Sequence, residues 1–162
     1  MTKTLTALAA ALALASNIAF AHGEARHEAA VAPAVKEQKP WGLAGDAGRV
    51  SRTVEIRMTD AMRFSPDAIQ VKRGETLRFV LRNDGRMLHE MVIGTPAALA
   101  AHAAAMRKFP GMEHDEPYMA HVAPGKTGEI VWQFNRSGDF EFACLIPGHY
   151  EAGMVGRITV GR

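Results

Sequence analysis

The chain has 162 residues, of which 19 are Lys or Arg and 17 are Asp or Glu, so its formal net charge is +2. This length suits one domain, and 48% hydrophobic with 22% charged residues is a globular composition, which argues against a fibrous repeat or disorder throughout. Basic and acidic residues are interleaved, so no concentrated basic face indicates a nucleic-acid partner. The single cysteine excludes an intramolecular disulfide.

Residues 1–21 are predicted to be a cleaved export signal. Lys3 gives a positive start, residues 5–15 are an apolar run rich in Leu and Ala, and residues 19–21 form a small-x-small cleavage site. The apolar run is shorter than the ~20 residues needed to span a bilayer, so we expect no membrane anchor in the mature chain. Exported thiols are normally paired, so the lone Cys144 needs another role, as a reactive thiol, an intermolecular bridge or a metal ligand.

Residues 22–50 are predicted to form a flexible N-terminal arm. They are rich in Ala, Glu, Gly and Pro and show no steady apolar period, which is a poor composition for burying surface. Trp41 is an exception because a large aromatic side chain is costly to expose, so we expect the arm to dock there. The folded domain is expected to cover residues 51–162.

The rest of the chain alternates apolar and polar residues with the period of two that is typical of half-buried strands. Seven or eight such strands, separated by turns that contain glycine, predict an all-β fold: an antiparallel Greek-key sandwich or barrel. A short helix is expected at about residues 96–108, after the capping pair Thr95-Pro96. The strand signals are Val54/Ile56/Met58, Ile69/Val71, Leu77/Phe79/Leu81, Ile130/Trp132/Phe134, residues 140–144 and residues 155–160.

The segment from Cys144 to Met154 has the residue types of a copper site. Four residues separate Cys144 from His149, and four more separate His149 from Met154. A thiolate, an imidazole and a thioether are the ligands of copper that alternates between Cu(I) and Cu(II), with the thioether as the weak axial ligand. Such a site needs a second imidazole, and the candidate is His89, in an apolar stretch that folding would have to bring alongside.

Two other interpretations of these residues stay open. A buried cysteine, a core methionine and two surface histidines can coincide in a β domain without forming a site. Zinc is a weaker competitor, since methionine is a poor zinc ligand and structural zinc sites prefer two or more thiolates.

The four residues resemble the cupredoxins, the small blue-copper proteins. In that family the first histidine lies upstream, and the cysteine, the second histidine and the methionine share one loop between the last two strands. The resemblance implies a cupredoxin-like sandwich with one type 1 copper held by His89, Cys144 and His149, with Met154 as the axial ligand. The loop spacing is similar to that of rusticyanin.

Residues 39–162 look most similar to the bacterial copper-tolerance cupredoxins, through Lys39-Pro-Trp-Gly and Asp60-Ala-Met-Arg-Phe64. This implies a periplasmic protein with one-electron redox activity that serves copper tolerance. The alternative is a soluble electron carrier between redox partner proteins. Glu90 departs from the pattern, because many cupredoxins place Asn or Ser beside the first histidine. The sequence contains no recognisable nucleophile and base pair, so no enzymatic activity is expected.

A repeated Met-x-His unit, formed by Met112 and His114 and by Met119 and His121, suggests a second, labile copper site. The alternative interpretation is that the methionines pack in the core and the histidines are ordinary surface groups.

The expected new N-terminus suggests a third copper site. The α-amine and imidazole of His22 could chelate Cu(II) together, with His27 as a further donor. The alternative is that export signals happen to leave a histidine there.

Overall fold

A computed structural model describes residues 36–109 and 115–162 of the chain. The predicted export signal, His22 and His27, together with Met112 and His114, lie outside these residues. The described residues form ten strands, one α-helix, α1 (Pro96–Lys108), and one short 3-10 helix, η1 (Ala47–Arg49). The strands are β1 (Leu43–Ala44), β2 (Arg52–Thr59), β3 (Arg63–Ser65), β4 (Ala68–Val71), β5 (Thr76–Asn83), β6 (His89–Gly94), β7 (Met119–Val122), β8 (Thr127–Gln133), β9 (Gly138–Ala143) and β10 (Val155–Val160).

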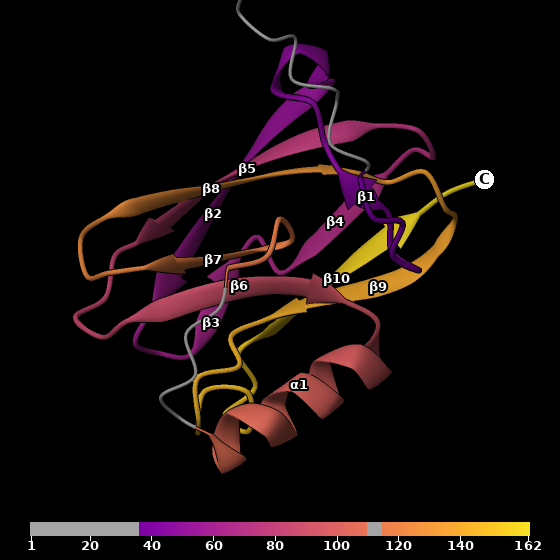
Figure 1. Ribbon diagram of the computed structural model, residues 1–162. Coiled ribbons are helices and arrows are strands. Elements are labelled where there is room, and N and C mark those ends of the chain that lie inside the picture. The colour runs from indigo at the N-terminus through magenta and orange to yellow at the C-terminus, as the bar shows by residue number, and fades with distance from the viewer. Residues whose placement is uncertain (1–35, 110–114) are drawn as a thin grey trace, which may run out of the picture. The chain divides into compact units, whose positions relative to one another are not determined.

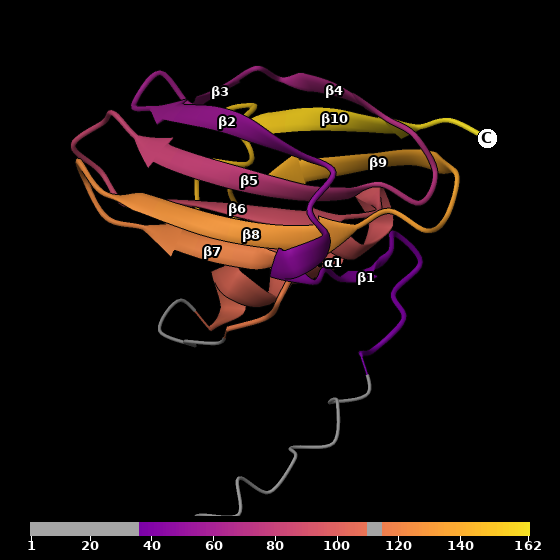
Figure 2. The ribbon, with the colours of Figure 1, turned by 90° about the horizontal axis from the view of Figure 1, so that it is seen from above.

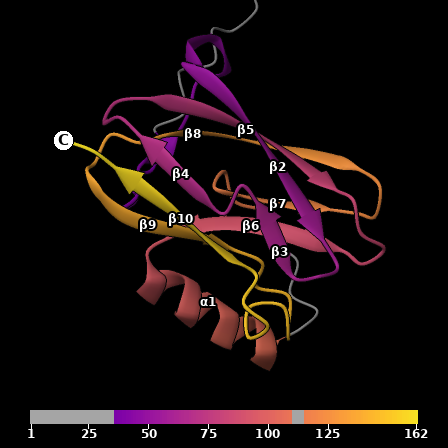
Figure 3. The same cartoon turned by 180° about the vertical axis from the view of Figure 1, so that it is seen from behind.

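The strands form two five-stranded sheets that lie face to face (Figure 1). One sheet has the strand order β1-β8-β5-β2-β3 and the other has the order β4-β10-β9-β6-β7. The view from above looks onto the sheet that contains β8, β5 and β2 in that order (Figure 2), and the view from behind shows β4 beside β10 (Figure 3). The predicted all-β sandwich with one short helix is confirmed.

Two details of that prediction are wrong. The sandwich is not wholly antiparallel, since β2 pairs with β5 and β4 pairs with β10 in parallel register. The described chain also holds more strands than the expected seven or eight. The strand signals lack β1, β3, β6 and β7. Strands β1 and β3 have only two and three residues, which is too short for an alternating pattern to stand out, and burial along β6 and β7 does not alternate.

The space between the sheets is filled by the inward side of each alternating strand. In β5 the side chains of Leu77, Phe79 and Leu81 are fully buried, while residues between them are more exposed. Ile130 and Trp132 of β8 join the same apolar cluster, and Met91 and Ile93 join it from β6 in the opposite sheet. Burial of this apolar surface is the main term that stabilises the sandwich.

The segment around Trp41 docks on the first sheet, as the sequence predicts. Trp41 is buried, its carbonyl accepts a 3.0 Å hydrogen bond from Trp132 Nε1, and β1 then pairs with β8. Gly42 permits this approach, because its φ is +130° and an added Cβ would lie 2.2 Å from the Gln133 carbonyl oxygen. The sheet therefore starts before residue 51, the expected start of the domain.

Helix α1 lies outside the sheet that contains β6 and β9 (Figure 1). Thr95 caps its first turn, since the Thr95 side chain accepts a 3.2 Å hydrogen bond from the Ala98 N–H. Leu99 and Ala103 bury one side of the helix in an apolar cluster that also contains Leu145, in the loop that follows β9. No helix in the described residues is long and apolar enough to cross a membrane.

Candidate metal centre

The C-terminal loop, residues 144–154, connects β9 to β10 and is held by its own backbone. The Cys144 N–H donates to the Met154 carbonyl at 3.1 Å, and the Met154 N–H donates to the His149 carbonyl at 3.0 Å. Because β6 pairs with β9, His89 at the start of β6 belongs to the same sheet as the loop. The antiparallel pairing thus brings together residues that are 55 or more positions apart in the sequence.

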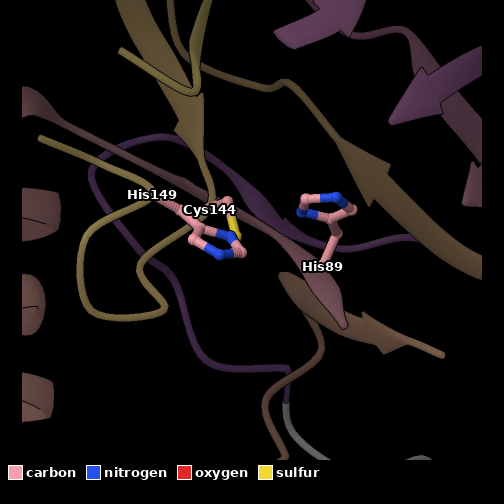
Figure 4. A group of neighbouring side chains, drawn as sticks. All are labelled: His89, Cys144 and His149. Atoms are coloured by element: carbon pink, nitrogen blue, oxygen red, sulfur yellow. The ribbon is translucent and has the colours of Figure 1, made fainter. Parts of the chain in front are cut away.

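Three side chains converge in this region from two segments of the chain (Figure 4). Metal-binding atoms of His89, Cys144 and His149 all lie within 4.8 Å of one another. Cys144 Sγ is 3.2 Å from His149 Nδ1, and the two imidazole rings have centroids 5.0 Å apart. Among the described residues, these three form the one cluster of at least three His, Cys, Asp or Glu side chains suited to a metal ion.

Burial distinguishes the members of the cluster. His89 and Cys144 are completely buried, and His149 keeps 5% of its surface exposed. Met154 is also completely buried, in the same apolar cluster as Cys144. A buried thiol and two imidazoles with a thioether nearby are soft and borderline donors, and this donor set fits copper.

One nitrogen of His89 has no hydrogen-bond partner although it is buried. Nε2 lies 3.1 Å from Asp60 Oδ1, whereas the buried Nδ1 has no partner. Buried polar atoms are nearly always satisfied, so an orphaned nitrogen calls for a missing ligand. A metal ion beside Cys144 and His149 supplies one.

Glu90 ties β6 to the C-terminal loop. Its backbone N–H points at Cys144 Sγ, 3.5 Å away, and its Oε1 accepts a 2.7 Å hydrogen bond from the Leu145 N–H. Its other oxygen, Oε2, lies 2.7 Å from His121 Nε2. The carboxylate that departs from the usual Asn or Ser therefore still binds the loop beside the thiol.

The environment favours uncharged Cys144 and His149 before a metal binds. Burial, as the main cause, raises the pKa of the Cys144 thiol from 9.0 to about 12. Burial also lowers the pKa of His149, and the nearby His89 lowers it further. A metal ion must therefore displace the thiol proton, while the His149 imidazole is ready to bind as a neutral ligand.

Asp60 is a contact of the site that the sequence did not predict. It lies between β2 and β3, and its pKa is lowered chiefly by the hydrogen bond from the Arg86 N–H. The Met87 N–H and His89 lower it further. In the sequence, residues 60–64 matter only through a family resemblance. No spacing rule links an aspartate to a histidine 29 residues later, so the contact could not be predicted.

The residues proposed for a second copper site lie in different environments. Met119 is buried in the apolar cluster beneath α1, whereas His121 is partly exposed and pairs with Glu90. Met112 and His114 fall outside the described residues. The second site therefore stays a prediction, as does the N-terminal site at His22.

The chain matches a known protein family and has named relatives. Residues 50–161 match the model of the copper-binding proteins of the plastocyanin/azurin family. A relative in Rubrivivax gelatinosus, named copper-resistant cuproprotein CopI, is 55% identical over 86% of this chain and 82% of its own length. The Pseudomonas aeruginosa protein of the same name is 38% identical over 74% of this chain and 82% of its own length.

Solved structures agree at the level of the fold. Auracyanin B superimposes with a TM-score of 0.64 at 22% identity, covering 78% of this chain and all of that one. Auracyanin from Roseiflexus castenholzii superimposes with a TM-score of 0.60 at 23% identity, covering 70% of this chain and 99% of that one. The chain belongs to the plastocyanin/azurin family and is a copper-binding cupredoxin.

Proposed function

We propose that His89, Cys144 and His149 hold one copper ion in a type 1 centre, with Met154 as a weaker fourth ligand. The observation that carries this proposal is the buried His-Cys-His cluster in which His89 Nδ1 lacks a partner. The family match supports copper as the metal.

Bound copper would supply a one-electron exchange between Cu(I) and Cu(II). The chain's own contribution is to fix the ligands and exclude water. Strand β6 holds His89 in the sheet, and β9 ends immediately before Cys144. The backbone bonds of the C-terminal loop hold His149 and Met154. Because this scaffold is rigid, we expect the ligand positions to change little when the copper gains or loses an electron. His149 is the most exposed of the four, so it is the proposed point of electron exchange.

We further propose that the protein serves copper tolerance in the periplasm. The two relatives named copper-resistant cuproprotein support this role, and the export signal expected at residues 1–21 supports the location. The role requires copper binding and electron exchange, with no enzymatic reaction.

Replacement of Cys144 by serine tests the copper centre. Wild-type protein loaded with Cu(II) should show intense thiolate-to-copper absorption, and Cys144→Ser should lack it while retaining its far-UV circular dichroism. A variant that keeps the absorption would overturn the ligand assignment. Wild-type protein without the absorption would overturn the type 1 centre itself.

A second candidate role is that of a soluble electron carrier. Complete burial of His89, Cys144 and Met154 favours it, since a carrier must retain its copper through many cycles. Deletion of the gene separates the roles. Copper tolerance predicts a copper-sensitive strain that wild-type protein rescues and Cys144→Ser does not, whereas a carrier predicts loss of an electron-transfer activity at normal copper levels.

A further inference from the structure

We propose that Asp60 is a positioning residue for the copper centre: it fixes the proton of His89 on Nε2, directs Nδ1 at the metal, and strengthens His89 as a ligand. This inference rests on the proposed function for its redox consequence. Its structural part concerns only the two side chains and can be tested without metal.

The first support is the contrast between the two nitrogens of His89. Nε2 lies 3.1 Å from Asp60 Oδ1, and a carboxylate can only accept a hydrogen bond, so Nε2 must carry the proton. Nδ1 of the neutral ring then has a free lone pair, and it is the buried nitrogen without a partner. Asp60 thereby selects the tautomer in which the ring presents Nδ1 as a metal ligand.

The second support is that the Asp60 carboxylate is itself held in place. Its Oδ2 accepts a 2.8 Å hydrogen bond from the Arg86 N–H, and its Oδ1 accepts a 3.3 Å bond from the Met87 N–H. These donors lie in the turn that leads into β6 and His89. The turn therefore fixes the carboxylate and the imidazole in the same geometry.

Gly85 makes room for this arrangement. A Cβ added at residue 85 would lie 2.1 Å from Asp60 Oδ1 and 2.8 Å from Asp60 Cγ, distances that no real side chain tolerates. Any larger residue there must push the carboxylate away from the turn. The close approach of Asp60 is thus built into the backbone of the β5–β6 connection.

A carboxylate that accepts the second N–H of a ligating histidine raises the basicity of that histidine. A more basic His89 stabilises Cu(II) more than Cu(I), so Asp60 lowers the reduction potential of the proposed centre. The side chain of Asp60 is 36% exposed, so water screens part of its charge and limits the effect. An asparagine side chain has a similar shape but does not replace the carboxylate, because Asp60→Asn removes the negative charge and turns one accepting oxygen into an NH₂ donor that faces another donor.

The metal-free protein gives the first test. Two-dimensional NMR of the ring nitrogens, assigned with a His89→Gln variant, should find His89 as the Nε2–H tautomer in wild type. In Asp60→Ala the Nδ1–H form should appear. A wild-type His89 protonated on Nδ1, or ring signals unchanged in Asp60→Ala, would overturn the proposal.

The copper-loaded protein gives the second test. Asp60→Asn and Asp60→Ala should bind Cu(II) about tenfold to a hundredfold more weakly and show a higher reduction potential than wild type. Asp84→Asn is the matched control, since this exposed carboxylate in the same connection pairs with Arg57 and Arg82 instead. If the folded Asp60 variants have the same reduction potential as wild type and Asp84→Asn, the proposed effect of Asp60 on the reduction potential is wrong.

The two proposals fail in different ways. Wild type without thiolate-to-copper absorption would end the type 1 proposal, yet the tautomer of metal-free His89 would still be decided by NMR. Conversely, intact absorption with His89 protonated on Nδ1 would end the role of Asp60 alone. If the Asp60 variants do not fold, the wild-type tautomer remains decisive.

Discussion

Glu90 and Leu145 join the two segments of the metal centre, because Glu90 Oε1 accepts a 2.7 Å hydrogen bond from the Leu145 N–H. Glu90 immediately follows His89, and Leu145 immediately follows Cys144, so this bond sets the spacing between two proposed ligands. Glu90 is 1% exposed, and its second oxygen faces His121 on the neighbouring strand β7. Glu90, which is not a proposed ligand, thus links β6, β7 and the C-terminal loop.

We expect Glu90→Ala to lower the free energy of unfolding by about 1–3 kcal/mol, because the buried Leu145 N–H loses its acceptor. Glu90→Gln should lose less, since its amide oxygen can still accept that bond. Urea unfolding of the metal-free variants measures both. Glu55→Ala is the control, since Glu55 is exposed and pairs loosely with Arg82. Equal stability of Glu90→Ala and Glu55→Ala would contradict the expectation.

The metal-free protein should lose stability between about pH 9 and pH 12. Burial raises the pKa of Cys144 from 9.0 to about 12, so in this range the unfolded thiol has lost its proton and the folded thiol retains it. The unfolded state then binds fewer protons, and stability falls as pH rises, by at most about 1.4 kcal/mol per pH unit from this group. Below pH 9 the contribution is constant.

The measurement compares wild type with Cys144→Ala by denaturant unfolding at several pH values from 8 to 11. Tyr and Lys groups titrate in both proteins, so only the difference between the two curves reports on Cys144. The curves should converge as pH rises. Parallel curves would show that the thiol keeps an ordinary pKa.

Helix α1 should stabilise the C-terminal loop through Leu99. This side chain is buried in the apolar cluster that also contains Leu145, so Leu99→Ala should cost about 2–5 kcal/mol of stability in urea unfolding. Phe109→Ala is the control, because Phe109 at the end of the helix is 52% exposed and should change stability by less than about 0.5 kcal/mol. Similar losses in both variants would mean that the Leu99 contact does not support the loop.

Met154→Leu should keep copper bound and raise the reduction potential. Leucine preserves the apolar volume but removes the thioether sulfur, and loss of a weak donor favours Cu(I) over Cu(II). Cyclic voltammetry of the copper-loaded protein measures the shift. Met58→Leu is a matched control, because Met58 is equally buried in the same cluster. Equal potentials for the two variants would remove Met154 from the proposed ligand set.

The sequence predicted most of the longer elements, because their signals are local. The capping pair Thr95-Pro96 and the following alanines placed the helix at its observed bounds, and alternation placed β2, β5 and β10. Strands β1, β3, β6 and β7 gave no such signal, since β1 and β3 have two and three residues and burial along β6 and β7 does not alternate. Parallel pairing of β2 with β5 also depends on contacts distant in sequence.

The sequence by itself determined the candidate ligands, because Cys144, His149 and Met154 lie on one short loop whose spacing is visible in the printed chain. Only the tertiary structure brought His89 beside Cys144 and His149 and gave Asp60 and Glu90 their contacts with the site. The reason is physical: donor chemistry belongs to individual residues, whereas the distance between donors on separate strands is set by sheet register and packing.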